Sequence, residues 1–160
     1  MSAARRPFWR RCVRDDSGLS TIEFAIIGPL SFILVLMTME LALDMCVDAT
    51  VQIAAQQASR TGLTTVNPTT GTRSDQAKAI INTILGGWTN IGATIAIDTV
   101  SYGAYGAIGT SSSTDGSLGG FGDVVSYNIT LTMPPFTGIP KLVGINQLVF
   151  QRNYIVQNEK

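Results

Sequence analysis

The longest apolar stretch of the chain lies near its N-terminus, where the run from Phe24 to Met39 holds sixteen residues without a charge. Extending the run to Leu43 adds only one charged residue, Glu40, and gives twenty residues. As an α-helix this segment is about 30 Å long, which is enough to cross a bilayer. Pro29 lies one turn into the run, and we expect it to kink the helix or to loosen its first turns.

The helical pattern continues beyond the apolar run. Two opposing stripes follow it, a polar one (Asp44, Asp48, Gln52 and Gln56) and an apolar one (Val47, Val51, Ala54, Ala55 and Ala58). This spacing predicts one helix from Ile22 to Thr61, about 60 Å long, with Gly62 as its stop. The small alanines allow close approach either to the domain that follows or to a helix of another subunit, and we favour the first.

The remaining pattern predicts a second helix and three strands. The second helix begins after Ser74, carries an apolar face and ends at Gly86 and Gly87. Alternating stretches at residues 93–97, 125–133 and 148–156 predict the strands, with a bulge or strand end near Asp98, where the alternation changes phase. The predicted fold class is α+β: a long N-terminal transmembrane helix continues into a small domain, in which the second helix packs on a three-stranded antiparallel sheet.

Two features of the outer part depart from these patterns. Arg152 interrupts the apolar face of the third strand. The glycine-rich segment 103–122 is expected to be a long mobile loop, because it has no lysine and no following helix that would make it a phosphate loop. Three aromatic residues flank or lie within it and are candidates for contact with a partner: Tyr102, Tyr105 and Phe121.

The distribution of charge predicts the orientation in the membrane. Five arginines precede the apolar run: Arg5, Arg6, Arg10, Arg11 and Arg14. The positive-inside rule then places the N-terminus in the cytoplasm and the rest of the chain outside the inner membrane. We divide the chain into a leader (1–18), a transmembrane helix (19–43) and an outer domain (44–160). A cleaved secretory signal is the competing interpretation, but the exit Glu40-Leu-Ala-Leu-Asp44 is a poor cleavage site.

Composition argues against several kinds of function. Beyond the first eighteen residues the chain has six basic and nine acidic side chains, a net charge of −3, which does not favour nucleic-acid binding. The chain has no histidine, and its carboxylates are scattered, so no catalytic constellation can be named and we expect no enzyme and no cofactor. Asp115 and Asp123 are too few for a usual calcium site. Cys12 and Cys46 flank the apolar run, so we expect no disulfide between them and a small buried role for Cys46 rather than a cross-link.

One motif carries the functional hypothesis. Gly18 precedes the apolar run and Glu23 stands at its entrance. A carboxylate at the edge of a membrane helix is costly unless it is paired or reaches the headgroups. If a peptidase cut after Gly18, the new α-amino group of Leu19 would be a cation able to pair with Glu23 of a neighbouring subunit. The alternative is a glutamate hydrated at the membrane surface, with Gly18 as a flexible joint.

This arrangement resembles the class III signal of type IV pilin-like proteins. The segment from Glu23 through Phe24 and Pro29 to Glu40, the Ala-rich segment 54–62 and the closing residues 152–154 and 158–159 resemble the TadE-like family. The resemblance implies cleavage by a prepilin peptidase between Gly18 and Leu19, and a minor pilin or pseudopilin role in assembling, priming or capping a Tad (tight adherence) pilus. The implied partners are that peptidase, other Tad pilins, the inner-membrane assembly platform and membrane lipid, without nucleic acid.

Other functional classes remain open. TadF-like pseudopilins share the leader and anchor, whereas TadG-like proteins are usually longer. A single-pass binding module unrelated to pili, such as an adhesin or a sensor stalk, would keep its leader uncut. Either way the chain is expected in a bacterial inner membrane with its C-terminal domain in the periplasm, and a pilin could pass from there into an extracellular fibre.

Overall fold

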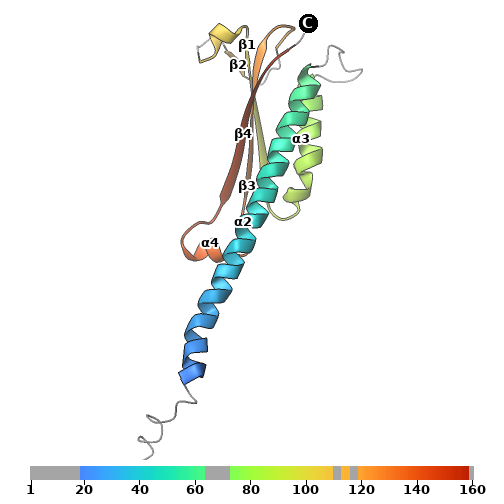
Figure 1. Ribbon diagram of the computed structural model, residues 1–160. Coiled ribbons are helices and arrows are strands. Elements are labelled where there is room, and N and C mark those ends of the chain that lie inside the picture. Colours follow the sequence, from blue (N-terminus) through green and yellow to red (C-terminus); the bar gives the residue numbers. More distant parts are fainter. Residues whose placement is uncertain (1–18, 64–72, 110–112, 116–118, 159–160) are drawn as a thin grey trace, which may run out of the picture.

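A single long helix runs the length of the molecule. The computed structural model describes residues 19–63, 73–109, 113–115 and 119–158 (Figure 1). Helix α2 spans Leu19–Leu63, 45 residues, and continues without interruption across Pro29. Its N-terminal half projects alone, whereas its C-terminal half lies beside a sheet and a second helix (Figure 1). The predicted long helix is therefore confirmed, with ends three residues before and two residues after the expected ones.

The outer domain is built on an antiparallel sheet. Its long strands are β1 (Thr94–Tyr102), β3 (Val124–Met133) and β4 (Leu148–Gln157). They lie side by side in chain order, which confirms the predicted α+β class and the three-stranded sheet. A short strand, β2 (Ser113–Asp115), pairs with the end of β1 and makes the sheet order β2-β1-β3-β4.

The glycine-rich segment differs from its prediction as a plain loop. It contains β2 and one turn of 3-10 helix, η2 (Tyr105–Ala107). The apolar–polar pattern gave no sign of β2, because a three-residue edge strand is stabilised by backbone pairing to β1 and needs no apolar face.

The predicted bulge or strand end near Asp98 is wrong. Strand β1 pairs with β3 from Thr94 opposite Thr132 to Tyr102 opposite Val124, with no residue skipped. The change of phase arises because the core-facing positions 99 and 101 hold a threonine and a serine, both buried. Backbone hydrogen bonding to β3 thus maintains the register of β1 at the positions where the core-facing residues are no longer apolar.

The predicted end of the second helix is also wrong. Helix α3 spans Arg73–Thr89 and passes through both glycines. Beyond them, the Trp88 indole N–H donates a hydrogen bond to the Thr50 hydroxyl (2.9 Å), and its ring meets Phe136 edge-on with 6.2 Å between centroids. These contacts stabilise the last turn and outweigh the low helix propensity of two glycines.

The core lies between the sheet and the two helices. Buried apolar side chains of α2, α3 and the three long strands form one cluster. Its α2 members are the predicted stripe: Val47, Val51, Ala54, Ala55 and Ala58, each at most 2% exposed. The expectation that this stripe packs within the same chain is therefore confirmed, and the alanines allow α2 to lie close to its neighbours.

A short helix, α4 (Ile139–Leu142), connects β3 to β4. It lies at the end of the sheet nearest the projecting half of α2 (Figure 1). This places it at the level where the outer domain begins.

Candidate membrane anchor and its junction with the outer domain

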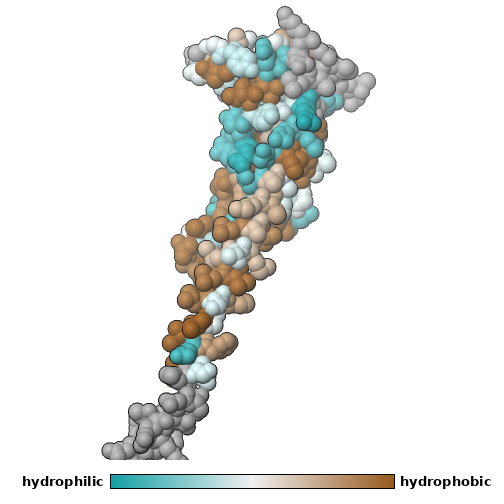
Figure 2. Space-filling model, in the orientation of Figure 1, coloured by the Kyte–Doolittle hydropathy of each residue, from teal (hydrophilic) through white to brown (hydrophobic). Residues whose placement is uncertain are grey.

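The projecting half of α2 exposes large apolar side chains. Phe24 is 76% exposed and Phe32 is 65% exposed, and every residue from 20 to 39 except Gly28 and Leu36 is exposed. Figure 2 shows this rod as predominantly hydrophobic over the face in view. Among the described residues, α2 is the one helix long and apolar enough to cross a membrane. A core helix that passes the same test would be mostly buried, whereas only 6% of this apolar window is buried.

Glu23 is the single charged residue between Ser20 and Met39. It is exposed and lies one turn from Leu19, where α2 begins. Among the described residues no basic side chain pairs with it. The other half of the predicted processing site, Gly18, lies outside the described residues. The geometry thus leaves the Glu23 carboxylate available to a group from outside the described chain.

Phe24 and Pro29 both lie in the exposed part of the helix. A Cβ added at Gly28 would stand 3.6 Å from the Phe24 ring, an ordinary contact distance. The ring therefore lies along the helix beside Gly28. Phe24 and Pro29 bring no polar chemistry to the segment and contribute apolar surface.

Glu40, assigned from the sequence to the membrane helix, is 2% exposed and packs against the outer domain. Its carboxylate accepts hydrogen bonds from the backbone N–H of Phe136 (2.8 Å) and of Thr137 (2.6 Å). Two prolines, Pro134 and Pro135, end β3 immediately before these residues and have no N–H to donate. Hydrogen bonds to a charged group stabilise by about 1.5–3 kcal/mol each, so Glu40 fixes the outer domain to α2 at one defined turn.

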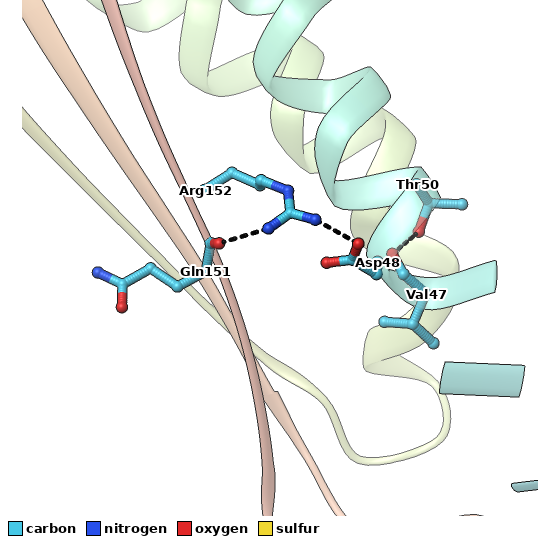
Figure 3. Close-up of polar contacts among 5 residues, drawn as sticks. All are labelled: Val47, Asp48, Thr50, Gln151 and Arg152. Carbon is cyan, nitrogen blue, oxygen red and sulfur yellow. Dashed lines mark hydrogen bonds and ion pairs between the residues drawn. The ribbon is translucent and has the colours of Figure 1, made fainter. Parts of the chain in front are cut away.

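A second polar contact lies farther along the helix. Arg152 points from β4 toward α2 and forms an ion pair with Asp48, as Figure 3 shows. Its guanidinium also donates to the Gln151 carbonyl at 3.3 Å. The position that interrupts the apolar face of β4 therefore faces a carboxylate on the helix. Both side chains are more than a third exposed, so water screens their attraction.

The third contact joins both helices. Thr50 accepts the indole hydrogen bond of Trp88 and donates its own hydroxyl to the Val47 carbonyl at 2.7 Å. The partners in these three contacts are 38 to 104 positions apart in the chain. Local sequence patterns hold no signal for such distant pairs, so none of the three contacts was predicted from the sequence.

Two groups on α2 near the junction differ from expectation or from ordinary behaviour. Cys46 is exposed, which contradicts the expected buried role, because the helix buries positions 47 and 51 and turns position 46 away from the domain. The pKa of Asp44 is raised above its ordinary value, mainly by burial and to a smaller extent by the charge of Glu40 one turn away. One carboxylate oxygen of Asp44 is buried without a hydrogen-bond partner.

Two open grooves lie between α2 and β4. One, of about 350 Å³, is lined by Asp44, Asp48, Phe150 and neighbouring residues of α2, and the other, of about 450 Å³, by Gln56, Ser59, Arg60 and residues 154–156. In the described part of the chain, no three His, Cys, Asp or Glu side chains come together as metal ligands. The distinctive chemistry therefore lies in the anchor and its junction.

The N-terminal part of the chain is similar to a known protein family. A family model described as TadE-like protein matches residues 18–60, which confirms the resemblance recognised from the sequence. The match covers the anchor and the packed half of α2, and it does not extend to the sheet. No curated protein and no solved structure matches the chain.

Proposed function

Because residues 18–60 match the TadE-like family and hold a helix able to span a membrane, we propose that this protein is a minor pilin or pseudopilin of a Tad pilus. In this proposal the spanning segment is shortened from the predicted 19–43 to residues 20–39, because Glu40 packs against the outer domain. This segment crosses the bacterial inner membrane with the N-terminus in the cytoplasm. The outer domain then stands in the periplasm, where it takes part in assembling, priming or capping the fibre. The protein acts by binding other pilins and the assembly platform, and not as an enzyme.

Processing is the first step of the proposed role. A prepilin peptidase cuts between Gly18 and Leu19 and leaves a new α-amino group at the residue where α2 begins. Glu23 stands one turn away and is the lone charge of the segment. A charged side chain costs roughly 2.5–3.5 kcal/mol at the centre of a membrane helix and less near its end, where Glu23 lies. Pairing with the amine of a neighbouring subunit reduces the cost of holding both charges in the bilayer. This pair fixes the register of adjacent helices.

The observation that carries the proposal is the exposed apolar half of α2 with its single carboxylate next to the start of the helix. A simple anchor needs only apolar surface. A carboxylate placed just inside the apolar segment is unfavourable for a solitary helix and becomes favourable when a cation is brought to it. The two hydrogen bonds of Glu40 attach the outer domain to the helix, so the position of the helix in the fibre also sets the position of the domain.

The proposal is tested first by the mass and N-terminal sequence of the protein from membranes with and without the prepilin peptidase. We expect a peptidase-dependent N-terminus at Leu19, and an uncut leader in Gly18→Ala. A leader that stays intact in both strains would remove the pilin role and favour an unprocessed binding module.

A second experiment tests Glu23 by itself. We expect Glu23→Ala to be cut normally and to reach the membrane, while its co-purification with other pilins falls at least tenfold. The matched control is Thr21→Ala, which removes a polar side chain from the same turn and leaves the charge in place. Equal assembly of Glu23→Ala and the control would contradict the proposed pairing.

A further inference from the structure

The segment that follows β3 carries an exposed apolar surface that the pilin role does not use. Leu142 and Val143, at the end of α4, are 76% and 74% exposed, and Ile145 is 46% exposed. Lys141 beside them is also exposed. We name residues 141–145 the apolar foot. Its two most exposed members match the exposure of the lipid-facing half of α2.

The foot is held in a defined shape. Pro140 is buried at its base, and the Ile145 N–H donates to the Pro140 carbonyl at 3.0 Å. Gly138 and Gly144, with φ of 73° and 87°, close the turn on either side in a conformation that favours glycine. The apolar side chains are therefore presented to the outside by a structured turn.

The height of the foot along α2 is also fixed. The Glu40 carboxylate binds the backbone of Phe136 and Thr137, which are separated from α4 by Gly138 alone, and α4 packs against α2. The twenty residues from 20 to 39 span about 30 Å, the thickness of the hydrocarbon core. Glu40 then stands where the helix leaves the hydrocarbon, and the foot stands at the same level.

From this placement we propose that the apolar foot is a second membrane contact, which inserts Leu142, Val143 and Ile145 into the outer face of the bilayer that α2 crosses. Lys141 reaches the phosphate groups from the edge of the patch, as lysines at membrane surfaces do. The inference rests on the proposed anchoring by α2. Two contacts, one spanning and one interfacial, set the tilt of the outer domain relative to the membrane.

Lipid is the occupant because the foot continues the lipid-facing surface. Leu41, at 56% exposed, extends the apolar face of α2 to the level of the foot. Figure 2 shows the hydrophobic colour passing from the rod onto the lower end of the outer domain, with hydrophilic residues above it. A patch that touches the bilayer edge meets lipid without any further partner.

The test uses the full-length chain, one copy per nanodisc, in phosphatidylcholine with phosphatidylglycerol. A nitroxide spin label is placed at position 143 in a Cys12→Ser, Cys46→Ser background, by Val143→Cys. Matched labels at positions 34 and 105, by Leu34→Cys and Tyr105→Cys, report the spanning helix and the far end of the outer domain. Collision rates with oxygen, which partitions into lipid, and with a water-soluble nickel chelate give the depth of each label.

We expect the label at 143 to be at least threefold more accessible to oxygen relative to nickel than the label at 105. The label at 34 is expected to lie deeper than either. A label at 143 that collides freely with nickel, while the label at 34 lies in lipid, would overturn the foot and leave the anchor intact. A label at 34 in water would instead overturn the anchoring itself. Shielding of position 143 from both reagents would indicate protein contact and also overturn the inference.

Discussion

Both halves of α2 carry apolar residues, but those of the N-terminal half are exposed, whereas the apolar stripe of the C-terminal half is buried. From residue 20 to 39 the helix carries large side chains, and Phe24, Phe32 and Leu34 are each at least 60% exposed. From Val47 to Ala58 the stripe that faces the domain consists of valines and alanines, each at most 2% exposed. The boundary between the halves is one buried carboxylate, Glu40.

The difference shows that apolar character alone does not decide burial in this helix. Small residues let α2 approach the sheet and α3, where close packing stabilises the domain. Large residues all round the other half leave no polar face for water and no narrow stripe for a partner, which is the pattern expected for contact with lipid. The following substitutions test whether the halves are energetically as separate as they look.

The largest expected effect is a loss of outer-domain stability when a carboxylate is placed in the buried half of α2, compared with the same substitution in the exposed half. Val51→Asp places a carboxylate in the core and is expected to destabilise the outer domain by at least about 3 kcal/mol. Val35→Asp is the matched control and is expected to leave the folding of that domain unchanged, because Val35 is 55% exposed on the projecting half. Pulse proteolysis in urea, on protein in nanodiscs, measures both. Equal loss from the two variants would show that the halves are coupled.

The next effect concerns the junction. Glu40→Ala leaves the N–H groups of Phe136 and Thr137 without their acceptor and is expected to cost about 3 kcal/mol of outer-domain stability. Glu40→Gln keeps one acceptor oxygen and is expected to recover roughly half of that loss. Urea unfolding of the outer domain distinguishes the variants. If Glu40→Ala unfolds at the wild-type midpoint, the two hydrogen bonds do not hold the domain to the helix.

A smaller effect is expected at the exposed ion pair. Arg152→Met removes the charge that meets Asp48 and is expected to cost less than about 1 kcal/mol, because both partners are partly solvated. The difference from wild type should shrink further in 1 M salt. Arg152→Lys keeps the positive charge and is the control. A cost that does not change with salt would point to packing of the arginine stem as the cause.

The smallest effect concerns pH. Burial and the charge of Glu40 raise the pKa of Asp44, so the folded domain holds the Asp44 proton more tightly than the unfolded chain does. The resulting stability is fully present below the ordinary aspartate pKa and is lost as pH rises through the raised value. Asp44→Asn removes this loss, so its stability relative to wild type should rise with pH across that window. Urea midpoints measured from acid to neutral pH check the sign, and a difference independent of pH would contradict it.

The sequence by itself determined the features that repeat along one segment. These features are the apolar run and the four-residue stripes of α2 and the regular alternation of β3. They follow from the periodicity of a helix or a strand and from which of its faces is shielded from water. Residues 18–60, which include most of α2, carried most of the family resemblance, and the family model matches this segment. The processing site and the pairing of Glu23 stay predictions, since they concern a bond and a partner outside the described residues.

Tertiary structure alone decided the features that depend on distant residues. Glu40 looked like one more residue of the membrane helix, and only the donors of Phe136 and Thr137 made it a junction. In the sequence Arg152 only interrupts the apolar face of a strand, whereas in the structure it forms an ion pair with Asp48 of α2. Helix α3 continues through two glycines because Trp88, in its last turn, forms a hydrogen bond with Thr50 of α2. In each case the stabilising contact is made with a partner at least 38 positions away in the chain. The periodicity of a local segment contains no information about such a partner.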